Sequence, residues 1–127
     1  MQQRTPVNSS RVPTPVGPYS QAVCTGSFLF TSGIIPIDLQ TGAISEGSIE
    51  DHAHLVFRYL RMLAEDAGTH LDKAVKVTIF LTDIAHFQQV NAVYTQYFSE
   101  PYPARSALQV AALPKGAMIE VEAVISL

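Results

Sequence analysis

Five segments of the chain have the composition and the alternation of apolar and polar residues that predict β-strands. In the most regular of them, residues 118–127, the odd-numbered side chains from Ile119 to Leu127 are apolar and form a core face, whereas Glu120 and Glu122 lie on the opposite face. Glycine, proline and small polar residues separate the segments, as in the short turn Thr25-Gly26-Ser27. The predicted strands are residues 19–25, 28–33, 75–81, 105–110 and 118–127.

Two other segments have helical spacing of apolar residues. The first begins at a predicted capping box, in which Ser48 and Asp51 satisfy exposed amides, and it ends near Gly68. Its predicted buried positions are Ile49, Ala53, Val56, Leu60, Leu63 and Ala67. The second helix is expected to begin at Asp83 and to end by Pro101. Its predicted packed stripe is Phe87, Val90, Tyr94, Tyr97 and Phe98.

The order β-β-α-β-α-β-β predicts one α+β domain over residues 1–127, with a single mixed β-sheet and two helices packed on one face. Residues 1–12 are polar and turn-prone, and we expect a loosely held N-terminal arm there. The face without helices also carries apolar side chains, among them Phe28 and Phe30 or Leu29. An isolated sheet of this kind would expose an apolar patch, so we expect copies of the chain to cover it.

Composition and charge limit the classes of function. The formal net charge is −3, and the eight Lys and Arg residues are scattered, so we do not expect nucleic acid as a partner. The single cysteine, Cys24, excludes an intramolecular disulfide. We see neither a secretory leader nor a run long enough for a membrane span, and we expect a cytoplasmic protein. The spacing of His52 and His54 on a helix does not suit a metal, and we expect none.

The candidate chemistry centres on Arg105 and Glu120. Arg105 begins one predicted strand, and Glu120 lies on the polar face of the last one. If these strands pair as a hairpin, the guanidinium and the carboxylate reach the same face, and a small acid could bind between them. Taken singly, either residue could equally be a solvated side chain or half of a surface ion pair.

Several motifs resemble those of the RidA/YjgF family of imine deaminases over nearly the whole chain, from about Thr14 to the C-terminus. They occur in the family's order and approximate spacing. The motifs are Gly17-Pro18-Tyr19-Ser20-Gln21-Ala22-Val23, Phe30-Thr31-Ser32-Gly33-Ile34-Ile35-Pro36, Pro103-Ala104-Arg105-Ser106, Leu113-Pro114-Lys115 and Ile119-Glu120-Val121-Glu122-Ala123.

The resemblance implies a chorismate-mutase-like fold and a homotrimer with three sites in the clefts between subunits. It implies that Arg105 holds the substrate carboxylate and that Glu120 positions the attacking water. The residues that it places in the pocket are Tyr19, Ser32, Gly33 and Asn91. Backbone groups at Ala107 and Gly33 could orient the substrate nitrogen or the water. We expect no covalent nucleophile, and Ser32 is expected to have a positioning role.

The chain departs from the family pattern at a few positions. Ile34 stands where the family often has Gln, and Ala107 stands where many members have Cys. In the first helix, His52 and Tyr59 replace a typical Gln and Asn. These changes leave Arg105 and Glu120 in place, and they bear on substrate preference.

These observations favour cofactor-free hydrolysis of imines such as 2-aminoacrylate and 2-iminobutanoate to 2-ketoacids and ammonia. The expected partners are imino and keto acids and further copies of the chain. One alternative is a non-catalytic regulatory trimer that binds small carboxylates through Arg105. The other is a translation-inhibiting ribonuclease, against which the acidic charge counts.

Overall fold

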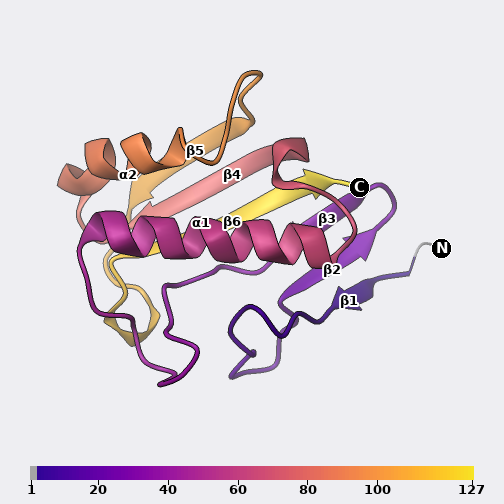
Figure 1. The fold of residues 1–127 in the computed structure, drawn as a ribbon, viewed down its shortest axis with the longest axis horizontal. Helices are drawn as coiled ribbons and strands as arrows, with labels where there is room; N and C mark the ends of the chain where they lie inside the picture. Colours follow the sequence, from indigo (N-terminus) through magenta and orange to yellow (C-terminus); the bar gives the residue numbers. More distant parts are fainter. Residues whose placement is uncertain (1–2) are drawn as a thin grey trace.

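The chain folds into one mixed sheet of six strands, covered on one face by two helices (Figure 1). The computed structural model describes residues 3–127. The strands lie in the order β1-β2-β3-β6-β4-β5. Their bounds are β1 Thr5–Val7, β2 Ala22–Thr25, β3 Phe28–Thr31, β4 Ala74–Leu81, β5 Ala104–Gln109 and β6 Ile119–Ser126. This confirms the predicted α+β class and the chorismate-mutase-like arrangement.

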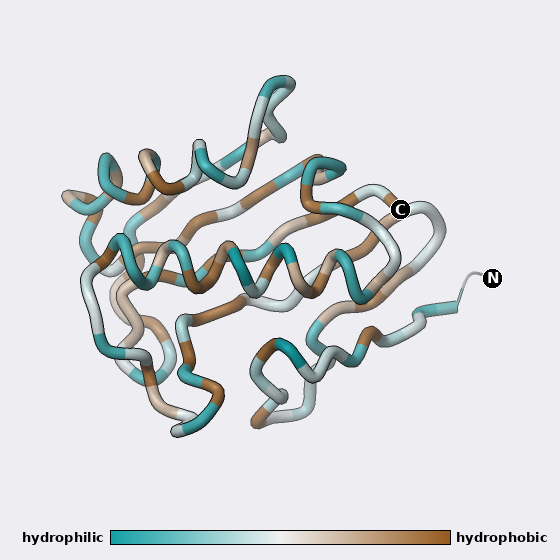
Figure 2. Tube along the Cα trace, viewed as in Figure 1, coloured by the Kyte–Doolittle hydropathy of each residue, from teal (hydrophilic) through white to brown (hydrophobic). Residues whose placement is uncertain are grey.

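The two helices are α1, Ile49–Asp66, and α2, Phe87–Tyr94. The capping box forms as predicted, because the Ser48 hydroxyl accepts from the Asp51 amide and the Asp51 carboxylate accepts from the Ser48 amide. Asp83 caps a short 3-10 turn, Ile84–His86, which precedes α2. Apolar residues of the helices and the strands alternate with polar ones along the chain, and the apolar sets meet between the two layers (Figure 2).

The pairing of the last two strands differs from the hairpin that the sequence analysis considered. β5 is an edge strand parallel to β4, and β6 lies antiparallel to β4 on its other side. The segment that contains α2 crosses over the sheet between β4 and β5, which makes this pair parallel. β4 therefore separates β5 from β6.

The N-terminal arm is not loose over its described part, so that prediction is wrong there. Residues 5–7 form β1 and pair with β2, and Val7 and Val12 are buried. Arg11 forms ion pairs with Glu65 and Asp66 at the end of α1. Hydrogen bonds to β2 and ion pairs with the C-terminal end of α1 thus fix the described part of the arm. Residues 1–2 of the predicted arm lie outside the described residues.

The sheet face without helices carries both apolar and charged side chains. Phe28, Phe30 and Leu108 each expose about two fifths of their surface there, and Glu122 and Lys76 line a pocket together with Phe30. Within residues 3–127, no helix is long and apolar enough to cross a membrane.

Candidate active site

The site residues that the sequence predicted fall into two separate groups. Asn91 and Arg105 lie in one pocket, which we call the Arg105 pocket. A second pocket, which we call the Glu120 pocket, is lined by Tyr19, Ser32, Gly33 and Glu120. No residue lines both pockets. One chain therefore does not bring the predicted residues of the two groups together.

The Arg105 guanidinium is fixed at one nitrogen and stacked on aromatic rings. Its Nη1 donates to Oδ1 of Asn91 at 2.7 Å. Its carbon Cζ lies 4.6 Å from the centre of the Tyr94 ring and 5.3 Å from that of Phe87. Among residues 3–127, no carboxylate forms an ion pair with Arg105. The remaining donors of this preorganised cation are available for an anionic ligand.

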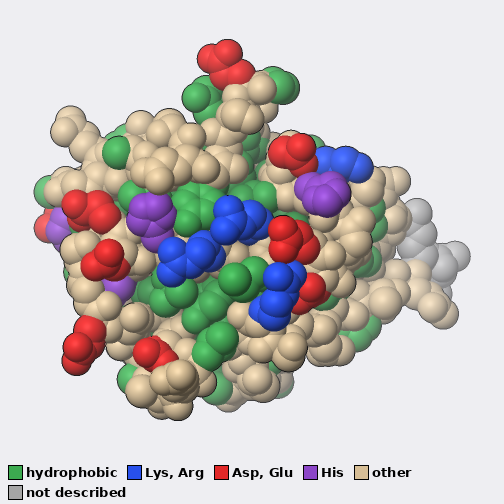
Figure 3. Space-filling view, in the orientation of Figure 1, with side chains coloured by type: hydrophobic (Ala, Val, Ile, Leu, Met, Phe, Trp, Pro, Cys, Tyr) green, Lys and Arg blue, Asp and Glu red, His purple; other side chains and the backbone are tan. Residues whose placement is uncertain are grey.

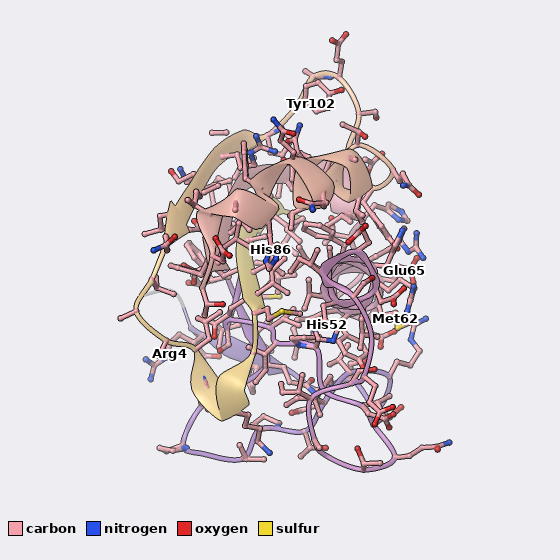
Figure 4. All side chains as sticks on the ribbon, turned by 90° about the vertical axis from the view of Figure 1, so that its left-hand side faces the viewer. Arg4, His52, Met62, Glu65, His86 and Tyr102 are labelled. Atoms are coloured by element: carbon pink, nitrogen blue, oxygen red, sulfur yellow. The ribbon has the colours of Figure 1, made fainter. Side chains whose placement is uncertain are left out.

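The Arg105 pocket has a volume of about 420 Å³. Its lining residues are Asn91, Tyr94, Thr95, Tyr102, Pro103 and Arg105. Tyr102 lies on the loop that connects α2 to β5 and projects from the body of the molecule (Figure 4). The pocket thus joins one cation to aromatic and small polar groups, a combination that suits a small carboxylate with an apolar portion.

The helical spacing of Phe87 and Tyr94 predicted core packing and did not reveal their contact with Arg105. These two residues and Asn91 are spaced by four and three positions along α2, so they share one helix face. That spacing is the signal that could have placed all three beside the strand that begins with Arg105.

The Glu120 pocket has a volume of about 330 Å³ and is mostly apolar. Its lining residues are Val16, Tyr19, Ser32, Gly33, Ile35, Ile37, Pro114, Lys115 and Glu120. Burial raises the pKa of the Glu120 carboxyl above its ordinary value, and the charge of Glu122 raises it further. No hydrogen bond or ion pair from residues 3–127 reaches this carboxylate in the structure. Glu120 is therefore a carboxylate that lacks a fixed partner, with the environment of a general base.

A local irregularity of the sheet brings Gly33 against Glu120. Between the pairs Phe30–Val124 and Ile34–Val121, residues 31–33 face only two residues of β6, as in a β-bulge. A Cβ atom on Gly33 would lie 2.2 Å from Oε2 of Glu120. Only glycine leaves room for the carboxylate at this position.

Ser32 has a structural partner, in agreement with the positioning role expected of it. Its hydroxyl donates to the carbonyl of Ser20 at 2.6 Å, and its amide donates to the carbonyl of Gln21 at 2.9 Å. These bonds hold the segment that carries Tyr19 beside the bulge. Half of the Tyr19 surface is exposed at the mouth of the Glu120 pocket.

The side chains of Arg105 and Glu120 project from opposite faces of the sheet. The expectation that they lie on the same face is therefore wrong. Arg105 lies beside Val77 on β4, whose side chain packs under the helices. Glu120 pairs with Phe80, three residues further along β4, so its side chain points to the face without helices. The alternation of side chains between the two faces was predicted correctly within β5 and within β6. The error arose because the two strands were expected to pair with each other, whereas β4 lies between them.

Ala107 lies on the helix side of β5, opposite Ile79, and packs against the core. It lines neither of the two pockets. Because β5 is the edge strand, part of its backbone is free to bind another group. The backbone role expected of Ala107 stays a prediction.

Charge on the helix-covered face is mixed rather than of one sign. In Figure 3, Lys and Arg side chains lie beside Asp and Glu side chains over α1. Arg11 with Glu65 and Asp66 is one such group. Over the described part of the chain, no group of three or more His, Cys, Asp or Glu residues could hold a metal ion.

Comparison with known proteins shows the family. A sequence model described as Endoribonuclease L-PSP matches residues 9–127. The chain belongs to this family, also called RidA/YjgF. RutC family protein y4sK of Sinorhizobium fredii is 48% identical over 122 residues, which are 96% of this chain and 97% of that protein. The human RidA/YjgF relative named 2-iminobutanoate/2-iminopropanoate deaminase is 40% identical over 95% of this chain and 88% of its own length.

Solved structures of RidA/YjgF proteins have the same fold. A putative endoribonuclease of Thermotoga maritima superposes with a TM-score of 0.94 at 42% identity, over 98% of both chains. Escherichia coli TdcF with bound serine superposes with a TM-score of 0.90 at 37% identity, over 97% of this chain and 98% of that one. The resemblance found in the sequence motifs is thereby confirmed.

Proposed function

We propose that the protein hydrolyses 2-imino acids and their enamine tautomers to 2-ketoacids and ammonia without a cofactor. The proposed site lies between two subunits of a homotrimer, with Arg105 from one chain and Glu120 from the next. The observation that carries the proposal is a pair of charges that form no ion pair within residues 3–127. They are a preorganised guanidinium and a half-buried carboxylate, each in its own pocket.

Substrate binding would rest on the Arg105 pocket. An imino acid has a carboxylate next to an electrophilic C=N carbon, and a planar guanidinium can hold that carboxylate by two parallel hydrogen bonds. Asn91 and the ring of Tyr94 fix the plane of the guanidinium, so the bound carboxylate has a fixed orientation. This orientation presents one face of the C=N bond to the second subunit.

Hydrolysis would rest on Glu120. Water adds to C2 of the protonated imine while Glu120 accepts one water proton, which gives a carbinolamine. The proton then passes to the amine nitrogen. The C–N bond breaks while Glu120 accepts the hydroxyl proton, so that the oxygen becomes the ketone and ammonia leaves. Glu120 finally gives this proton to the ammonia, which departs as ammonium. General-base catalysis of this kind typically contributes about 10²–10⁴-fold. The raised pKa of Glu120 supports this role, because it makes the ionised carboxylate a stronger base.

The opposite orientations of Arg105 and Glu120 support a two-subunit arrangement, because a small acid bound to one sheet would not contact both side chains. The apolar residues of the face without helices support self-association, since contact with another subunit would remove the exposed side chains of Phe28, Phe30 and Leu108 from solvent. A closed ring of three copies would repeat one contact three times and give three equal sites.

The names of relatives support the reaction class. Proteins about 40% identical to this chain are named 2-iminobutanoate/2-iminopropanoate deaminase and putative reactive intermediate deaminase. The TdcF structure with bound serine is that of a neighbour that binds an amino acid, which has the same carboxylate next to a nitrogen-bearing carbon. The ribonuclease alternative shares the name of the family model, but the net charge of −3 and the mixed charges over α1 do not provide a basic surface for RNA.

A coupled assay tests the proposal. The purified protein is added to a threonine dehydratase reaction, and the appearance of 2-ketobutanoate is followed after the imine is released. We expect faster appearance than spontaneous hydrolysis gives, and an acceleration at least about tenfold smaller by Arg105→Lys at the same concentration. If the assembled wild-type protein does not accelerate the reaction with imines of several amino acids, the enzyme proposal fails. Binding of 2-ketobutanoate without turnover would then favour the regulatory alternative.

A further inference from the structure

The segment between β3 and α1 forms a small hairpin that supplies one wall of the Glu120 pocket. We call residues 36–45 the wall hairpin. Ile37 and Ile44 form an isolated bridge, and the amide of Ser45 donates to the carbonyl of Pro36 at 2.8 Å. The turn closes at Asp38, whose amide donates to the carbonyl of Ala43. Ile37 and the adjacent Ile35 line the Glu120 pocket.

Two buried side chains of α1 bind the two ends of the wall hairpin. The Tyr59 hydroxyl donates to the carbonyl of Ile37 at 2.5 Å. Nε2 of His52 lies 2.6 Å from the carbonyl oxygen of Ser45, which requires a proton on that nitrogen. Figure 4 looks along α1 and labels His52 near this segment.

These two residues share one face of α1. His52 and Tyr59 are seven residues apart, about two helical turns, so they project from the same face of α1. Their partners, Ser45 and Ile37, stand at the two ends of the wall hairpin. Both side chains are at least nine-tenths buried, whereas the carbonyls that they bind belong to half-buried residues, so losing either donor would remove a hydrogen bond that holds the wall hairpin to α1.

We infer that His52 and Tyr59 are positioning residues that hold the wall hairpin against the Glu120 pocket and thereby set how long an apolar substrate side chain the site favours. The carbonyl that Tyr59 binds belongs to Ile37 itself, so the contact fixes a residue of the pocket wall directly. The sequence departs from the family pattern at these two helix positions, and this role explains what the replacements do. The specificity part of the inference rests on the proposed function, whereas the anchoring part does not.

Hydrogen exchange of the full-length assembled protein tests the anchoring. Tyr59→Phe and His52→Leu each remove one donor, and His52→Gln keeps an N–H donor. We expect the amides of Asp38, Gly42 and Ser45 to exchange about fivefold faster in the first two variants, with partial recovery in His52→Gln. Unchanged exchange in both Tyr59→Phe and His52→Leu would overturn the inference, whether or not the protein is an enzyme.

Matched controls come from the same helix. Nδ1 of His54 lies 2.9 Å from the hydroxyl of Tyr97, and this contact joins α1 to the segment after α2 without touching the wall hairpin. His54→Leu and Tyr97→Phe should therefore leave exchange of the wall hairpin as in the wild type. Equal acceleration in these controls would mean that general loosening, and not loss of an anchor, explains the result.

Kinetics test the specificity part. Imines are generated from alanine and from leucine by an amino-acid oxidase, and KM and kcat are measured for each variant. Tyr59→Phe should raise KM for the leucine-derived imine about fivefold, because its longer side chain contacts more of the apolar wall, and should change kcat for the alanine-derived imine less than about twofold. An equal change with both imines, or none, would overturn the specificity part. If the wild type turns over neither imine, the proposed function fails while hydrogen exchange still decides the anchoring.

Discussion

Arg105 and Glu120 lie on opposite sides of the same sheet, with β4 between their strands. Arg105 points toward α2 and binds Asn91, whereas Glu120 points to the face without helices and lies against Gly33. Neither residue has a charged partner among those that the structure describes. A ligand that contacts both charges would therefore have to lie between two copies of the chain.

Glu120 and Glu122 share a face of β6, and substitution separates their roles. Glu120→Gln keeps the size of the side chain and removes the base, so we expect turnover of the dehydratase-derived imine to fall at least about tenfold with assembly intact. Glu122→Gln should have a much smaller effect on turnover near neutral pH, because Glu122 lies about 7 Å further along the strand. Kinetics and size-exclusion chromatography of both variants provide the measurement. If Glu122→Gln is inactive and Glu120→Gln is active, the base is Glu122, and the assignment of Glu120 is wrong.

The pH dependence of activity should reflect the environment of Glu120. Burial first and Glu122 second raise its pKa, and the base must be ionised, so activity should fall with decreasing pH at values above the ordinary range of a glutamate. Glu122→Gln removes the second cause and should move the acid limb of kcat/KM to lower pH without bringing it back to the ordinary value. The pH profile of kcat/KM for the two proteins measures this shift. An acid limb that does not move, or that moves upward, would mean that it reports another group.

Gly33→Ala should disable Glu120 while leaving the fold intact. The added Cβ would overlap the carboxylate, which is the mobile end of a side chain and can move away. We expect turnover to fall about tenfold to a hundredfold, because small misplacements of a catalytic group have effects of this size. Gly17→Ala is the control, since its Cβ would make an ordinary 3.6 Å contact with the Tyr19 ring. Wild-type turnover in Gly33→Ala would show that the position of the Glu120 carboxylate does not matter.

Arg105→Lys keeps the charge and removes the planar fork. A lysine ammonium cannot bind a carboxylate by two parallel hydrogen bonds, so we expect kcat/KM to fall at least about tenfold even if some binding remains. Steady-state kinetics with the dehydratase-derived imine measure the effect. Near-normal turnover would show that guanidinium geometry has no part in catalysis.

Local patterns were sufficient for much of the fold. The capping box at Ser48, the helix α1 and the alternation of β4 and β6 follow from side-chain spacing and hydrogen-bonding capacity, which the sequence displays directly. Strand β1 was missed because Thr5–Val7 is short and contains a proline, and because its stability depends on pairing with β2.

The sequence nominated residues for the candidate site but could not give their arrangement. The family resemblance nominated Arg105, Asn91, Ser32, Gly33 and Glu120, whereas the relation between Arg105 and Glu120 depends on strand order. Strand order depends on contacts between residues far apart in the chain, here the insertion of β6 between β3 and β4. The contacts of His52 and Tyr59 with the wall hairpin depend on the same long-range packing.

Mixed oligomers test the two-subunit site most directly. Arg105→Lys and Glu120→Gln chains, each nearly inactive alone, are unfolded and refolded together at equal amounts, and mixing is verified with two different affinity tags. If each site takes Arg105 from one chain and Glu120 from its neighbour, about a quarter of the sites regain both native residues, so imine turnover should recover to about a quarter of the wild-type value. Turnover no greater than the average of the two parents, in oligomers shown to contain both chains, would contradict a site shared between subunits.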